Sequence, residues 1–121
     1  MKPFVNHIEK ILENPKVKID LKNASLYSIH SQQGVPQEDH LVIKRSAVGI
    51  TPFAELVGHV LRSNSFTKQK GVFQSGLITM ANHNESNIRL TISEKEIKFI
   101  LIPSITEHRK IVEALKKRYG L

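Results

Sequence analysis

The chain of 121 residues contains no cysteine. Disulfide frameworks, thiolate metal sites and cysteine nucleophiles are therefore excluded. Long apolar runs are also missing, because the longest one, Phe99 to Pro103, is far shorter than a membrane span. Met1 to Phe4 leads into a charged helical pattern and not into an apolar run of signal-peptide length. These absences predict a cytoplasmic protein without a transmembrane segment.

Acidic side chains are scarce relative to basic ones, with 11 Asp and Glu against 18 Lys and Arg, which gives a net charge of +7. Residues 1–40 hold five of each sign, so the whole excess follows residue 40. It amounts to +4 over residues 41–80, where Glu55 is the single acid, and +3 over residues 81–121. A basic region attracts polyanions such as nucleic acid or an anionic membrane surface. The alternative is that the charge only aids solubility.

The composition is that of an ordinary soluble protein, with 40% hydrophobic and 24% charged residues. The length suits one domain, and no repeat, low-complexity tract or linker divides the chain. We therefore expect residues 1–121 to form a single domain.

Local patterns predict an alternation of helices and strands along the first two thirds of the chain. The expected helices are Pro3–Glu13 and Pro52–Arg62, the second with Thr51 as its cap. Strands are expected at Val17–Lys22, Ser25–Ser31, His40–Arg45 and Leu77–Met80. Gln32–Asp39 and Ala81–Asn87 are expected to be polar connections, and Phe66–Gly76 a loop or irregular strand.

The most regular stretch is the last one. Ile88–Ile92 alternates apolar and polar residues, Ile97–Ile102 is apolar on both sides, and Thr106–Tyr119 has a helical period. The chain as a whole predicts an α+β fold, mainly antiparallel. We expect a strongly curved sheet or small partial barrel of about five to six strands with three helices, closed by this hairpin and amphipathic helix. Over Ile88–Leu121 alone, the arrangement resembles the pleckstrin-homology-like architecture, although the helix Pro52–Arg62 falls where that architecture has consecutive strands.

No catalytic or cofactor signature is present, so we expect neither an enzyme nor a cofactor. The six histidines form no HExxH-like pair. His30 and His40 flank the polar connection, and a metal site there would need Glu38 or Asp39 in addition. Surface or partly buried histidines are the simpler interpretation.

The candidate binding residues lie in the middle of the chain. Phe66–Gly76 interleaves lysines and aromatics, and in single-strand binding proteins cations follow the phosphates while rings stack on bases. The predicted phosphate contacts and stacking rings are Lys44, Arg45, Arg62, Lys68 and Lys70, with Phe66 and Phe73. The alternative is a loop whose phenylalanines pack into the core.

Two hypotheses of function follow. The first is a small, basic, non-enzymatic and regulatory domain that binds RNA or single-stranded DNA. The second is a protein-interaction or anionic-membrane module of pleckstrin-homology-like architecture, in which Ile97–Ile102 or the last helix forms an oligomer interface such as that of a homodimer.

Overall fold

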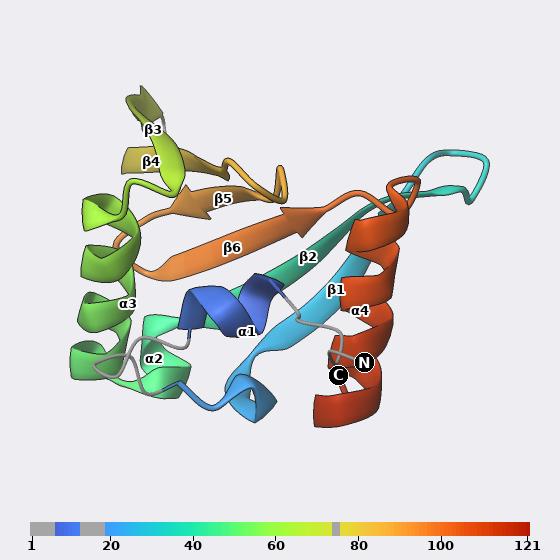
Figure 1. The fold of residues 1–121 in the computed structure, drawn as a ribbon, viewed down its shortest axis with the longest axis horizontal. Helices are drawn as coiled ribbons and strands as arrows, with labels where there is room; N and C mark the ends of the chain where they lie inside the picture. The colour runs from blue at the N-terminus through green and yellow to red at the C-terminus, as the bar shows by residue number, and fades with distance from the viewer. Residues whose placement is uncertain (1–6, 13–18, 74–75) are drawn as a thin grey trace.

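The computed structural model describes residues 7–12, 19–73 and 76–121 (Figure 1). The helices are α1 (His7–Leu12), the 3-10 helix η1 (Leu21–Asn23), α2 (Arg45–Val48), α3 (Ile50–Arg62) and α4 (Thr106–Tyr119). The strands are β1 (Ser25–His30), β2 (Pro36–Lys44), β3 (Phe66–Phe73), β4 (Gly76–His83), β5 (Arg89–Ile92) and β6 (Glu96–Leu101).

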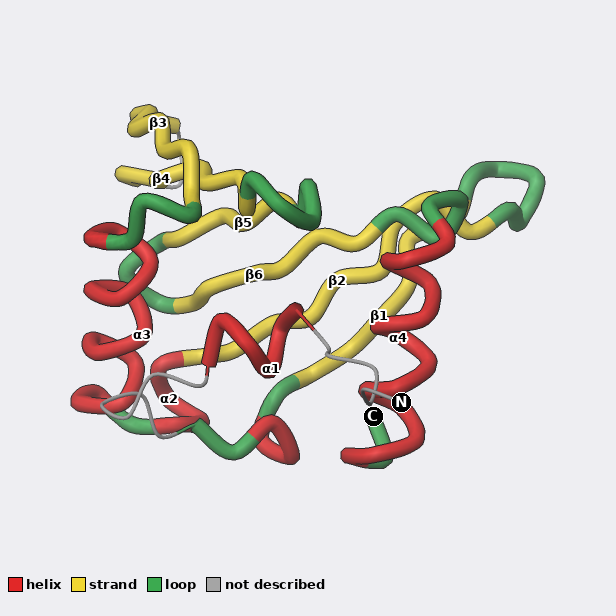
Figure 2. Tube along the Cα trace, viewed as in Figure 1, coloured by secondary structure: helices red, strands yellow, loops and turns green. Residues whose placement is uncertain are grey.

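The strands form one six-stranded sheet in the order β1-β2-β6-β5-β4-β3, and every neighbouring pair is antiparallel. Figure 2 shows the strands side by side, with β1 and β3 at opposite edges. The predicted α+β class and antiparallel sheet are confirmed. Among the described residues β1 and β3 do not pair with each other, so the sheet stays open.

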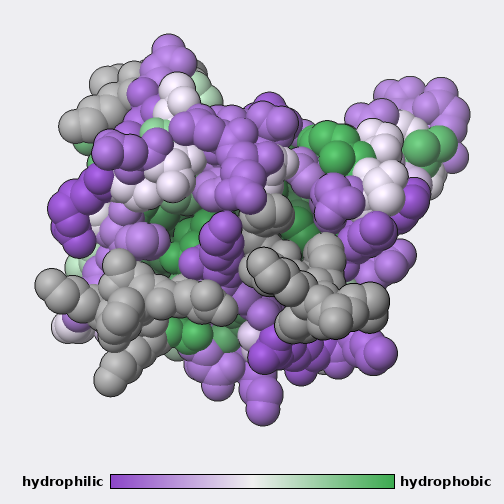
Figure 3. All heavy atoms as spheres, viewed as in Figure 1, coloured by the Kyte–Doolittle hydropathy of each residue, from purple (hydrophilic) through white to green (hydrophobic). Residues whose placement is uncertain are grey.

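The helices α1, α3 and α4 lie on the same side of the sheet (Figures 1 and 2). Their apolar side chains form one core with those that the sheet presents on this side, among them Leu41, Leu90 and Phe99. Ile8 of α1, Leu56 of α3 and Leu115 of α4 are all 0% exposed. Figure 3, viewed from this side, shows mostly polar side chains on the outer surfaces of α3 and α4. We call this side of the sheet the covered face.

The opposite side of the sheet carries no helix within the described residues, and we call it the open face. Because side chains alternate between faces, the register places one residue from each strand in a single row across it. From β1 to β3 this row is Tyr27, His40, Ile100, Arg89, Asn82 and Thr67. A mainly polar row of this kind is what an uncovered antiparallel sheet presents to water.

One predicted strand is wrong. Val17 and Lys18 lie outside the described residues, and the remainder of Val17–Lys22 forms no strand but leads into η1. The Asp20 side chain accepts a hydrogen bond from the backbone N–H of Lys22 at 2.9 Å, which favours a tight turn over an extended chain. Leu21 is buried at 3% exposure, so the apolar positions of the alternation still contribute to the core.

Two predicted connections are shorter than expected, because strand pairing extends into them. β2 begins at Pro36, within the expected loop Gln32–Asp39, and β4 continues to His83. Phe66–Phe73 is a regular strand that pairs with β4 along its whole length. Weak local patterns become strands here because a neighbouring strand supplies hydrogen-bond partners.

The second helix also starts differently from the expectation. α3 begins at Ile50 with Gly49 as its N-cap residue, which makes no side-chain capping bond, and the short helix α2 precedes it. The closing unit agrees with its prediction, since β5, β6 and α4 fall within a residue or so of the expected bounds.

Candidate functional site

Three cationic side chains line one groove at the end of β2. Lys44 ends that strand, Arg45 begins α2, and Lys95 belongs to the turn between β5 and β6. The groove has a volume of about 760 Å³ and is completed by Ser46, Gly49, Ile50 and Glu96. We call these seven residues the basic groove. Two of the predicted phosphate-binding residues, Lys44 and Arg45, are thus brought together with a third cation that the sequence did not single out.

The backbone fixes this convergence. The N–H of Arg45 donates to the carbonyl of Lys95 at 2.9 Å, which ties the start of α2 to the β5–β6 turn. Gly49 then ends α2 and begins α3, since its N–H donates to Arg45 O and its carbonyl accepts from Phe53 N. Its φ of +101° is a conformation that L-residues with a side chain rarely adopt. Glycine is therefore required where the chain turns along the groove.

The cations of the basic groove form no ion pair with another described residue. Within the described residues, no carboxylate lies within 4.0 Å of the charged nitrogens of Lys44, Arg45 or Lys95. Among the described residues, Glu96 is the one acid that lines the groove, and it lies opposite Lys44 in the β2–β6 register. Three cations against one acid give this groove a local excess of positive charge.

Arg62 and Lys68 lie at the opposite end of α3. The helix separates Arg62 from Ile50 by about 18 Å at 1.5 Å per residue. The Arg62 guanidinium folds back along α3 and lies against Gly58. The contact is so close that a Cβ atom at Gly58 would lie 2.6 Å from Nη1 of Arg62. The Lys68 ammonium donates to the carbonyls of Leu61 at 2.8 Å and Ser63 at 2.9 Å. Lys68 thereby binds free carbonyls at the C-terminus of α3, which is a structural role.

One of the two predicted stacking rings, that of Phe66, lies in the core. Phe66 is 5% exposed and packs edge-on against the ring of His83, with centroids 5.1 Å apart. Its ring belongs to the core, as the alternative interpretation of this stretch proposed. The side chains of Lys70 and Phe73 lie outside what the structure describes. The five predicted residues with described side chains therefore divide between the basic groove, the C-terminus of α3 and the core.

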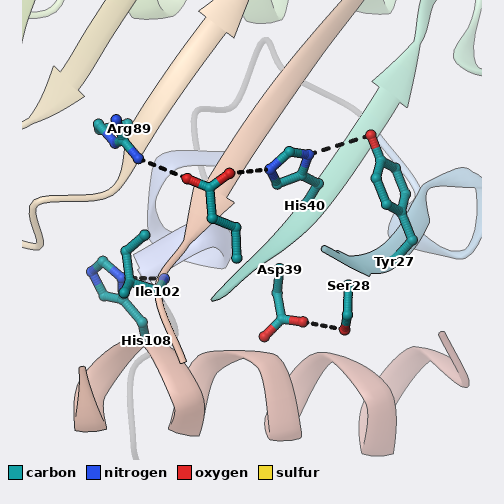
Figure 4. Close-up of polar contacts among 8 residues, drawn as sticks. Tyr27, Ser28, Asp39, His40, Arg89, Ile102 and His108 are labelled. Carbon is teal, nitrogen blue, oxygen red and sulfur yellow. Dashed lines mark hydrogen bonds and ion pairs between the residues drawn. The ribbon is translucent and has the colours of Figure 1, made fainter. Parts of the chain in front are cut away.

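A chain of four polar side chains crosses the open face (Figure 4). Arg89 of β5 donates to Glu38 of β2 at 3.0 Å, and the other oxygen of Glu38 lies 3.0 Å from Nε2 of His40. Nδ1 of His40 lies 3.3 Å from the hydroxyl of Tyr27, whose ring meets the imidazole edge-on. Because Arg89 reaches across β6, these contacts link three strands of the sheet and hold the His40 ring in place.

His108 has a structural role in the core, and His30 lies at the end of β1. His30 pairs with Pro36 and not with His40, so the two do not form the metal site considered above. Within residues 7–12, 19–73 and 76–121, no three His, Asp or Glu side chains are grouped to hold a metal ion. His108 is 0% exposed, accepts from the N–H of Ile102 at 3.0 Å and lies 2.7 Å from the carbonyl of Ser86.

Sequence reasoning missed Lys95 and the polar chain on the open face. Lys95 occupies a polar turn like many others, and only the pairing of β2 with β6 places it beside Arg45. The alternation in β2 does place Glu38 and His40 on one face, but the expected strand began only at His40. A strand assignment reaching back to Pro36 would have shown them together.

Comparison with models of protein families, with curated proteins and with solved structures finds no match for this chain. No helix in the described ranges is long and apolar enough to cross a membrane. The fold and the geometry of the site are therefore the basis for a functional proposal.

Proposed function

We propose that this protein is a small, non-enzymatic and cytoplasmic regulator that binds single-stranded nucleic acid, with the basic groove as its phosphate-binding surface. One observation carries the proposal. Lys44, Arg45 and Lys95 come from separate segments, converge on one groove and have no ion-pair partner among the described residues. Cations held in a groove without counter-ions are the arrangement that follows a phosphate backbone.

The groove also offers an apolar contact. Ile50 is 75% exposed, the largest exposure among the large hydrophobic side chains of the described residues. An apolar side chain beside the cations suits a single strand, because its unstacked bases and sugars present apolar surface that a duplex hides. The same combination of cations and an exposed Ile is also used by proteins that bind anionic membranes. The experiment must therefore separate the two ligands.

The test is fluorescence anisotropy with a labelled single-stranded RNA and DNA of about 16 nucleotides, a length within the range of single-strand sites. We compare the unmodified protein with a variant carrying Lys44→Glu, Arg45→Glu and Lys95→Glu. Loss of three phosphate contacts is expected to weaken binding more than about tenfold at low salt. It should also reduce the slope of log affinity against log salt by about 2, at roughly 0.7 per contact.

The matched control is Arg109→Glu, Lys116→Glu and Lys117→Glu on α4, which changes the net charge equally at three exposed positions. An equal loss of affinity in the two variants would show that only net charge matters and would overturn the groove as the site. Vesicles containing phosphatidylserine form the second arm. Co-sedimentation that depends on Ile50, without nucleic-acid binding, would replace the proposal with a membrane surface.

A further inference from the structure

The two edges of the sheet differ in how well they are protected against pairing with another chain. An edge strand presents unpaired backbone N–H and C=O groups, which proteins usually guard with lysine, proline, glycine bulges or a covering element. β3 carries two lysines in its sequence, Lys68 and Lys70. β1, with the sequence Ser-Leu-Tyr-Ser-Ile-His, has no Lys, Arg, Asp, Glu, Pro or Gly.

The β1 edge is also exposed and partly apolar. Five of its six residues are classed as exposed, and Tyr27 and Ile29 are 42% and 41% exposed. Both side chains lie on the open face, two residues apart. Within the described residues, β1 pairs only with β2. The outer backbone groups of β1 therefore have no strand partner among the described residues.

We propose that β1 pairs antiparallel with β1 of a second copy of this chain, about a twofold axis through Ser28. This register places Tyr27 opposite Ile29 of the partner, and the symmetry repeats that pair on the other side of the axis. Directly opposed aromatic and β-branched side chains stabilise antiparallel strands. The pairing is isologous, and it extends the open face into one continuous sheet of two copies.

The charge of the chain favours β1 over β3 as the edge at which two copies pair. Each copy carries +7, so two copies repel at most points of contact. Of the two edge strands, β1 is the one without a formal charge, so self-pairing there brings no lysine against lysine. The β3 edge has lysines in its sequence, so self-pairing there would bring like charges together.

The dimer is expected to be weak and to depend on salt in the opposite direction from nucleic-acid binding. A six-residue strand pair is smaller than the interfaces of stable dimers, which indicates association at micromolar concentrations. Added salt screens the repulsion between the two positive copies, so the dimer should persist or strengthen as salt rises. Phosphate binding weakens under the same change. The two proposals can therefore fail independently.

The first experiment uses the absence of cysteine. Ser28→Cys introduces a single thiol. The opposed Cα atoms of an antiparallel pair lie about 4.5–5.5 Å apart, within reach of a disulfide. Mild oxidation is expected to give a covalent dimer in nonreducing electrophoresis. The matched control, Thr67→Cys, places the thiol on the exposed opposite edge and should remain monomeric. A dimer formed equally by both variants, or by neither, would overturn the proposed interface.

The second experiment does not depend on the Ser28 variant folding. Ile29→Lys gives β1 the kind of charge that β3 carries, and is expected to shift the protein to monomer in sedimentation velocity across micromolar concentrations. Leu77→Lys makes the same change at a site that is 62% exposed on β4, and should leave the association unchanged. A monomeric unmodified protein at all concentrations, or a dimer unaffected by Ile29→Lys, would overturn the proposal.

Discussion

The two faces of the sheet derive from the same alternation of side chains but have opposite characters. On the covered face, Phe99, Leu101 and Ile97 of β6 are all 0% exposed. On the open face of the same strand, Lys98 and Ile100 are only partly buried. The polar chain from Arg89 to Tyr27 occupies the open face, whereas His108, which is 0% exposed, lies on the covered side.

This difference shows how the molecule distributes polar groups. On the covered side, both ring nitrogens of His108 have backbone partners, in Ile102 and Ser86. The open face uses side-chain partners that water can also reach. A side chain removed from the covered face should therefore cost much more stability than its counterpart on the open face.

The largest effect is expected from Phe99→Ala. This substitution leaves a cavity at the centre of the core, and should lower the free energy of unfolding by about 4 kcal/mol. Met80→Ala, on the open face at 40% exposure, should cost about 1 kcal/mol or less. Urea unfolding followed by circular dichroism measures both. Similar losses for the two variants would mean that the open face is also covered in solution.

An intermediate effect is expected from His108→Leu. The leucine fills similar volume but leaves Ile102 N–H and Ser86 C=O without their partner, at about 1–3 kcal/mol for each buried group. His40→Leu on the open face should cost about 1 kcal/mol, because Tyr27 and Glu38 can bond to water instead. His108→Gln, which retains a donor and an acceptor, should recover part of the loss. If His40→Leu lowered the free energy of unfolding as much as His108→Leu, the proposed difference between the two faces would be contradicted.

The smallest effect concerns Tyr119 at the end of α4. Burial and then the nearby Glu9 carboxylate, which accepts a hydrogen bond from its hydroxyl at 3.2 Å, raise the pKa of Tyr119 above 10.0. A raised pKa in the folded state adds stability that is present below pH 10.0 and is lost as the pH rises through the folded value. Tyr119→Phe should therefore flatten the decline of stability above pH 10.0.

Absorbance titration provides the direct check. The chain has two tyrosines, so Tyr27→Phe leaves Tyr119 as the single phenol to titrate. Its midpoint is expected above 10.0 in the folded protein and near that value in urea. Equal midpoints in the two conditions would show that the burial of Tyr119 and its contact with Glu9 do not persist in solution.

Much of the fold was predictable because its signals are local. The alternation in β5 and the helical period of α4, with His108, Val112 and Leu115 in its buried stripe, gave elements that the structure retains. The strand expected at Val17–Lys22 failed because Asp20 bonds to the backbone of Lys22, a local contact that competes with the extended chain. β3 was weakly predicted because its regularity comes from pairing with β4.

The candidate site was predictable only in part, for a related reason. Lys44 and Arg45 are adjacent in sequence, so their common location follows from the chain itself. Lys95 joins them only through the pairing of β2 with β6. Phe66 is of a residue type that both binding sites and cores use, and the structure shows it buried in the core. Residue type alone does not distinguish these two roles.

The sequence by itself determined the excess of basic charge, the absence of thiol chemistry, the α+β class and which side chains of each well-marked strand share a face. The tertiary structure alone decided which face the helices cover, which strands form the edges and which distant cations meet in the basic groove. The physical reason is that side-chain alternation and helical period are properties of neighbouring residues. The order of the strands, and the face of the sheet that the helices cover, depend on how the whole chain buries its apolar surface.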